Sequence, residues 1–205
     1  MTTITNTNNR VTIAYDMNLE NFQMASAIRG VLEFYGLQVT LVWLNEKQDA
    51  INFFAGHTLK TDYTILCAHG IGKENRIWMM VVEKVVGTEY RYEEVEFNLT
   101  PENIGEYVKN AGGTFITTAC ESGCEGFAKA FLAVGYRAFI APSVAEDLSS
   151  AVMFICGFFC NMIAHNRDIH KAMYTKREAV KHAAEIQPFP DGTAAFRYFD
   201  GNHNA

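Results

Sequence analysis

The chain has 205 residues, 49% of them apolar and 20% charged, with a net charge of −6. A chain of this length buries roughly 70% of its unfolded surface and needs neither a disulfide nor a metal to be stable. No stripe of Lys and Arg occurs, which counts against nucleic acid as a partner. We expect a single domain over 1–205, with irregular tails at 1–9 and 188–205.

Nothing in the sequence predicts a membrane segment. The N-terminus is polar and has no apolar core of a signal peptide. The longest apolar stretch, 151–163, is interrupted by Gly157 and Asn161 and is too short to span a bilayer. The five cysteines have no secretory context, so reduced thiols are expected. We therefore expect a cytoplasmic protein that contacts no membrane and binds no metal or cofactor.

Strands and helices alternate along the sequence. In chain order, the predicted elements are a strand at 11–15, a helix at 19–35, a strand at 37–44, a helix at 46–56, a strand at 63–68, a β-hairpin from 76–82 and 90–97, a helix capped by Thr100, a strand at 114–119, a helix at 123–134, a strand at 136–141, and helices at 145–165 and 168–186. Several strands are continuous apolar runs. This pattern indicates an α/β fold with a mostly parallel sheet and helices on both faces.

Two chemically active residues follow strands of this sheet. His69 comes directly after the strand at 63–68, and Cys120 directly after the strand at 114–119. Functional sites of open parallel sheets lie at the carboxyl ends of the strands. A cysteine nucleophile needs an imidazole and an oxyanion site, and Gly70 leaves room for a carbonyl to approach backbone N–H groups. The alternative is a small buried cysteine and a histidine in a turn.

The motifs around these residues match a known pattern. "TILCAHG" at 64–70 and "TFITTACESG" at 114–123 resemble the strand-His-Gly and strand-Cys-x-x-Gly motifs of the caspase-like cysteine peptidases. That group includes caspases, metacaspases, gingipains, separases and CHAT-domain proteins. Thr118-Ala119 before the cysteine, and the helix–strand–helix run that follows it, are closest to CHAT-domain proteins. The resemblance implies a three-layer α/β/α sandwich with a hairpin insertion after the His-Gly strand.

The resemblance also implies roles for individual residues. Cys120 would be the nucleophile of an endopeptidase, and His69 the acid/base that serves the leaving amine. The backbone N–H groups of Gly70 and Cys120 would form the oxyanion hole. The partner would be a protein or peptide substrate, with an activating protein as a second possible partner.

Three acidic residues are candidates for binding the substrate side chain before the scissile bond. Asp16 follows the first strand, and Glu146 and Asp147 follow the strand after Cys120. A carboxylate in a closed pocket selects Arg or Lys through a charge-assisted hydrogen bond, so cleavage after a basic residue is expected. The alternative is that Asp16 belongs to a turn and that Asp147 is a charge at a helix N-terminus.

Two other functions stay open at this stage. One is a non-catalytic or latent caspase-like regulatory domain that binds a peptide or protein partner. The other is a flavodoxin-like or Rossmann-like ligand binder in which His69 and Cys120 are coincidental. The sequence has no phosphate-binding loop after its first strand, which counts against the ligand binder.

Overall fold

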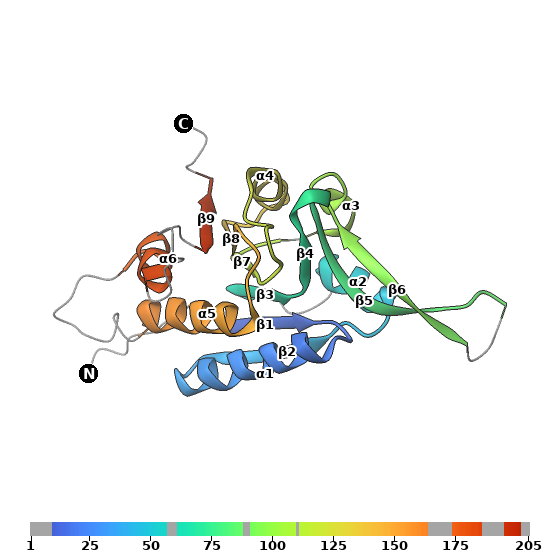
Figure 1. Cartoon of the computed structure of the whole chain (residues 1–205), viewed down its shortest axis with the longest axis horizontal. Coiled ribbons are helices and arrows are strands. Elements are labelled where there is room, and N and C mark those ends of the chain that lie inside the picture. The colour runs from blue at the N-terminus through green and yellow to red at the C-terminus, as the bar shows by residue number, and fades with distance from the viewer. Residues whose placement is uncertain are drawn as a thin grey trace.

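A computed structural model describes residues 10–56, 61–87, 91–109, 111–163, 174–185 and 195–201. These residues form two sheets and the helices around them (Figure 1). The strands of the larger sheet, in spatial order, are β2 (Gln38–Trp43), β1 (Arg10–Tyr15), β3 (Tyr63–Cys67), β7 (Thr114–Thr117), β8 (Ala138–Pro142) and β9 (Phe196–Asp200). The smaller sheet contains β4 (His69–Ile71), β5 (Arg76–Lys84) and β6 (Tyr92–Leu99).

The larger sheet is mostly parallel, as the apolar strands predict. β2, β1, β3, β7 and β8 pair in parallel, and β9 alone pairs antiparallel, with β8. The smaller sheet is antiparallel throughout and includes the predicted hairpin, formed by β5 and β6. The smaller sheet begins with β4, directly after β3. The hairpin extends away from the larger sheet, on the right of Figure 1.

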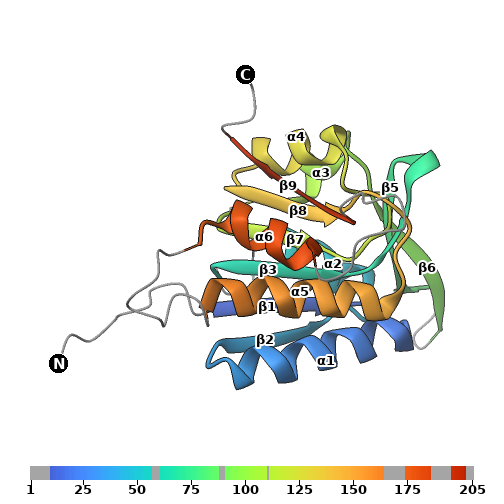
Figure 2. The ribbon, with the colours of Figure 1, turned by 60° about the vertical axis from the view of Figure 1, so that its left-hand side comes forward.

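Helices cover both faces of the larger sheet (Figure 2). The helices are α1 (Leu19–Phe34), α2 (Lys47–Phe54), α3 (Ile104–Tyr107), α4 (Glu125–Ala133), α5 (Leu148–Ile163) and α6 (Lys176–Glu185). Adjacent residues of one strand enter different cores: Ile65 packs with α1 and α5, whereas Leu66 packs with α2, α4 and the hairpin. Burial on both faces explains why the strands are apolar without alternation.

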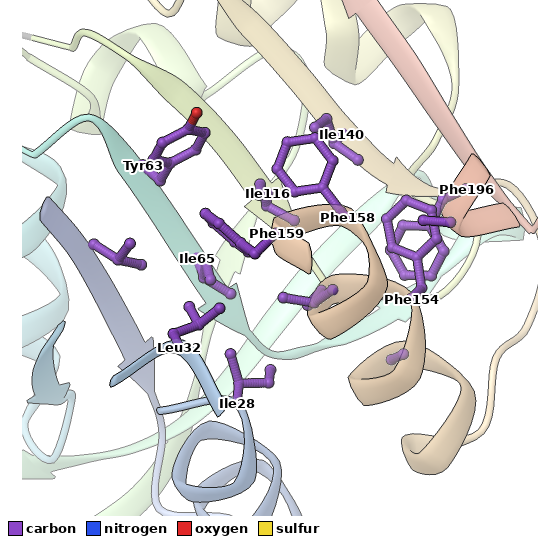
Figure 3. Close-up of a cluster of buried hydrophobic side chains, with 14 of the residues drawn as sticks. Ile28, Leu32, Tyr63, Ile65, Ile116, Ile140, Phe154, Phe158, Phe159 and Phe196 are labelled. Carbon is purple, nitrogen blue, oxygen red and sulfur yellow. The ribbon is translucent and has the colours of Figure 1, made fainter. Parts of the chain in front are cut away.

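The helix α5 closes the first of these cores (Figure 3). Phe154, Phe158 and Phe159 follow helical spacing and are buried against the sheet. Phe158 and Phe159 each pack on Tyr63 of β3, with ring centroids 6.2 and 5.0 Å apart. The apolar run at 151–163, which the sequence predicts to be a buried helix, therefore forms most of α5. Among the described residues, no helix has both the length and the hydropathy to cross a membrane.

Two predictions need correction. Part of the expected irregular tail, Phe196–Asp200, forms strand β9, because Phe196 stacks on Phe154 with ring centroids 3.8 Å apart. The helix expected to start at Thr100 begins only at Ile104, since the side chain of Asn103 accepts the Thr100 backbone N–H and closes a turn first. The tail expected at 1–9, the start of the predicted 168–186 helix at 168–173, its last residue, and the tail residues 188–194 and 202–205 lie outside the described residues.

Candidate active site

His69 and Cys120 meet because their strands are neighbours. β3 and β7 pair in parallel, so the chain leaves both strands at the same edge of the sheet. Thr118 joins the two exits: its N–H donates to the Leu66 carbonyl at 3.1 Å, and its hydroxyl lies 3.3 Å from the Ala68 N–H. The predicted juxtaposition of the two strand ends is confirmed.

One cavity of about 310 Å³ lies at this edge, and the side chains of His69 and Cys120 both line it. Its lining residues are Glu20, Asn21, Met24, Ala68, His69, Thr118, Cys120, Glu146, Asp147, Leu148 and Ala151. The walls come from α1, the ends of β3 and β7, and the start of α5. Among the described residues, no cluster of His, Cys, Asp and Glu side chains has the arrangement to hold a metal ion.

The turn after β7, which carries Cys120, has a strained backbone at its next residue. Glu121, the next residue, has φ of +57°, a conformation that costs a residue with a side chain roughly 1–2 kcal/mol. Hydrogen bonds hold the turn in place: the Ser122 hydroxyl donates to the Ala119 carbonyl at 2.6 Å, and the Glu121 N–H to the Val144 carbonyl at 3.1 Å. Strain of this kind, held by surrounding contacts, is frequent at functional sites.

The turns that carry His69 and Cys120 lie in close backbone contact at Gly70. A Cβ on Gly70 would lie 2.7 Å from the backbone nitrogen of Cys120 and closer still to its carbonyl oxygen. The carboxylate of Glu121 also accepts the Gly72 N–H at 3.0 Å. Glycine at position 70 is therefore required by space, because any side chain would separate the two turns.

The imidazole of His69 is held on two sides. Its ring stacks on Trp78, the cross-strand partner on β5, with centroids 4.5 Å apart and planes 22° apart. Its Nε2 lies 2.9 Å from the side-chain nitrogen of Asn18. No hydrogen bond joins His69 to Cys120.

The thiol of Cys120 instead contacts the loop before α5. The Glu146 N–H donates to Sγ at 3.3 Å, and Sγ lies 3.5 Å from the Glu146 carbonyl oxygen. His69 and Cys120 therefore line the same cavity, but each is hydrogen-bonded to a different residue: His69 to Asn18 and Cys120 to Glu146.

The acidic residues near the cavity differ in their surroundings. Glu146 and Asp147 line it, as does Glu20 at the start of α1. Burial, and then the neighbouring charge of Asp147, raises the pKa of Glu146, whose Oε1 is buried with no hydrogen-bond partner. Asp147 is exposed and accepts the N–H and hydroxyl of Ser150 at the start of α5, which lowers its pKa.

Asp16 has a different position from the other two predicted acids. It is 1% exposed and does not line the cavity. Its Oδ1 accepts the Asn18 N–H at 3.0 Å and the Asn21 side-chain amide at 2.8 Å, and its Oδ2 accepts the Met80 N–H at 2.7 Å. Asp16 therefore joins the start of α1 to strand β5.

Replacing Asp16 with alanine is expected to lower the free energy of unfolding by about 3 kcal/mol, because one buried and two part-buried donors lose their acceptor. Asp16→Asn, which keeps one acceptor oxygen, is the matched control and should cost about half as much. Urea unfolding measures both. If Asp16→Ala unfolded like the wild type but changed substrate preference, Asp16 would be a substrate-binding residue after all.

Two residues of the site were missed by sequence reasoning. Asn18 carries only the signal of a helix N-cap, which it is: its Oδ1 accepts the Glu20 N–H at 2.8 Å. Trp78 lies in the hairpin and gives no sign that it stacks on a histidine. The Asn18 contact joins residues 51 positions apart and the Trp78 contact depends on the pairing of β4 with β5, neither of which local sequence specifies.

The fold is similar to that of a known peptidase, although no protein-family model and no curated protein matches the sequence. The crystal structure of the Arg-specific cysteine proteinase gingipain R (RgpB) aligns with a TM-score of 0.58 and 12% identity over 92% of this chain. The complex of the pro- and mature domains of RgpB from Porphyromonas gingivalis aligns with a TM-score of 0.53 and 12% identity over 87%.

The chain spans less than half of these gingipain chains, 45% and 42%. At this identity the likeness concerns the fold, which is the caspase-like α/β arrangement that the sequence predicts. Flavodoxins from Streptococcus pneumoniae and Bacillus cereus align only with TM-scores of 0.37 and 0.38, too low to support an argument.

Proposed function

We propose that this protein is a cysteine endopeptidase in which Cys120 is the nucleophile and His69 the acid/base. The observation that carries the proposal is that both side chains line one cavity, at the carboxyl ends of neighbouring strands, in a gingipain-like fold. A kinship closer to CHAT-domain proteins than to gingipains is part of the same proposal and rests on the sequence motifs alone.

The proposed reaction has two steps. His69 takes the proton of the Cys120 thiol as the sulfur attacks the scissile carbonyl, and the N–H groups of Gly70 and Cys120 stabilise the oxyanion. Collapse of this intermediate breaks the C–N bond, His69 supplies a proton to the leaving amine, and a thioester remains. Water then attacks the thioester, His69 takes its proton, and the carboxylic acid leaves with the thiol restored.

The acidic lining of the cavity supports a basic residue before the scissile bond. Glu20, Glu146 and Asp147 line it, and no Lys or Arg is among the described lining residues. Among the described residues, Oε1 of Glu146 is buried with no hydrogen-bond partner, and a guanidinium or ammonium that displaced its cover would satisfy it. Asp16 is left out of this pocket because its oxygens already accept three hydrogen bonds.

Cleavage of a mixed peptide library, read by mass spectrometry, is expected to give products that end in Arg or Lys. Removing both loop charges, with Glu146→Gln and Asp147→Asn together, should lower kcat/KM for such peptides about 100-fold, since charge-assisted hydrogen bonds are lost. Glu125→Gln, on the exposed surface of α4, is the control. Preference for an acidic residue, or unchanged preference in the double variant, would refute the pocket.

Acidic pH should weaken the same interaction. The raised pKa of Glu146 means that it takes up a proton before an ordinary glutamate does as the pH falls. The affinity for a basic side chain is therefore complete above this pKa and decreases on acidification through it.

A second candidate function is a latent caspase-like domain that needs a partner protein for activity. The contact of the Cys120 thiol with the Glu146 backbone, in place of His69, favours it. Labelling with a thiol-reactive probe separates the two candidates: an active enzyme is labelled at Cys120 in the isolated chain, whereas a latent domain is labelled there only after its partner is added.

A further inference from the structure

The contact between Asn18 and His69 has a fixed polarity. Asn18 caps α1, and its Oδ1 accepts the backbone N–H of Glu20 at 2.8 Å. A backbone N–H only donates, so the oxygen of the amide must face it. The amide nitrogen, which also only donates, must then be the atom that lies 2.9 Å from His69 Nε2. Nε2 is therefore the acceptor in this pair.

An accepting Nε2 determines the state of the imidazole. A neutral imidazole has one nitrogen with a proton and one with a basic lone pair. If Nε2 accepts from Asn18, the proton is on Nδ1 and the single lone pair is occupied. An imidazolium would place Nε2–H against the N–H of Asn18, donor against donor, and the hydrogen bond between them would be lost.

We propose that Asn18 is a positioning residue that withholds the basic nitrogen of His69, so that the described arrangement is a resting state of the site. This inference rests on the proposed function for its biological meaning. The thiol matches it, because Sγ of Cys120 is hydrogen-bonded to the Glu146 backbone and not to His69. Activation then requires the Asn18–His69 contact to open.

Neighbouring hydrogen bonds hold Asn18 and His69 in place relative to each other. The Asn18 N–H donates to Asp16, and Asp16 also accepts the Met80 N–H of β5, two residues along the strand from the Trp78 that stacks on His69. Asn18 and the imidazole are therefore held relative to each other by the same strand. A ligand that shifts the start of α1, where Glu20 lines the cavity, would shift Asn18 as well.

Two substitutions test the proposal. Asn18→Ser keeps an N-cap residue but removes the amide, and it should raise the alkylation rate of Cys120 by iodoacetamide about tenfold at neutral pH, the effect of freeing one hydrogen-bonded lone pair. Asn18→Asp keeps the cap and turns the donor into an acceptor for Nε2–H, which moves the basic lone pair of His69 to Nδ1 and leaves it free, so it should also raise the rate. Mass spectrometry of the labelled peptides reports Cys120 separately from the other thiols.

The controls lie within the same chain. Cys124, the N-cap of α4, does not line the cavity, and its alkylation rate should not change. The gain at Cys120 should disappear when His69→Ala is added to Asn18→Ser. Unchanged or slower labelling of Cys120 in both Asn18 variants would overturn the proposal.

Nitrogen-15 NMR of the histidine rings provides a second readout that needs no substrate. The wild type should show the His69 proton on Nδ1, and Asn18→Asp should show it on Nε2 or on both nitrogens. A wild-type proton on Nε2 would refute the inference. If the labelling and NMR results appear but no variant cleaves any peptide, the proposed peptidase function fails and the role of Asn18 stands.

Discussion

Replacing Cys120 with alanine is expected to abolish cleavage after Arg or Lys, with a loss of at least about 10³-fold in kcat/KM. The side chain that lines the cavity would no longer contain a nucleophile, whereas the turn around it depends on backbone and Ser122 contacts that alanine leaves in place. The measurement is hydrolysis of a peptide selected from the library, in the wild-type chain and in the Asn18→Ser background.

The matched control for this substitution is Cys124→Ala. Cys124 lies four residues further on, does not line the cavity, and hydrogen-bonds Asn75 at 3.6 Å. Its replacement should leave kcat/KM within about threefold, the range of ordinary surface substitutions. If activity survived Cys120→Ala but was lost with Cys124→Ala, the nucleophile would be Cys124 and the assignment to Cys120 would be wrong.

Gly70→Ala should disrupt the site through the backbone. Its methyl group would lie within 2.8 Å of the backbone of Ala119 and Cys120, where neither partner is a flexible side chain. The turns that carry His69 and Cys120 must then separate, which removes the proposed oxyanion hole. We expect a loss of at least about 100-fold in kcat/KM, comparable to the removal of an oxyanion-hole donor, and a destabilisation of about 2 kcal/mol from overpacking.

Gly30→Ala is the control for the introduced methyl group. Gly30 lies on the exposed side of α1 with nothing within 4 Å of the new Cβ, so the substitution should stabilise the helix by up to about 1 kcal/mol. Urea unfolding and peptide hydrolysis measure both variants. If Gly70→Ala retained both stability and activity, the close contact at Gly70 would have no role in the site.

Much of the fold follows from local patterns. Apolar runs such as Tyr63–Cys67 predicted strands buried on both faces, and glycine after Tyr35 predicted the end of α1, where Gly36 has φ of +85°. The position of His69 and Cys120 after two such strands predicted the edge of the sheet at which they meet. Periodicity and turn residues contain this information because each depends on neighbours along the chain.

The pocket acids show where this reasoning stops. Asp16, Glu146 and Asp147 all follow strands, and their positions in the sequence do not distinguish them. Only the packing of β5 beside the start of α1 makes Asp16 an acceptor for Met80, a residue 64 positions away. The fold, and not the sequence position, likewise leaves Glu146 with a buried carboxylate oxygen that has no hydrogen-bond partner among the described residues.

The amino-acid pattern alone therefore determined the class of fold and the two residues most suited to cysteine chemistry. Tertiary structure decided the state of that pair, since the Asn18–His69 contact joins residues 51 positions apart and the thiol contact with Glu146 joins residues 26 apart. The physical reason is range: strand and helix preferences are local, whereas the polarity of a hydrogen bond at the site depends on every element that packs around it.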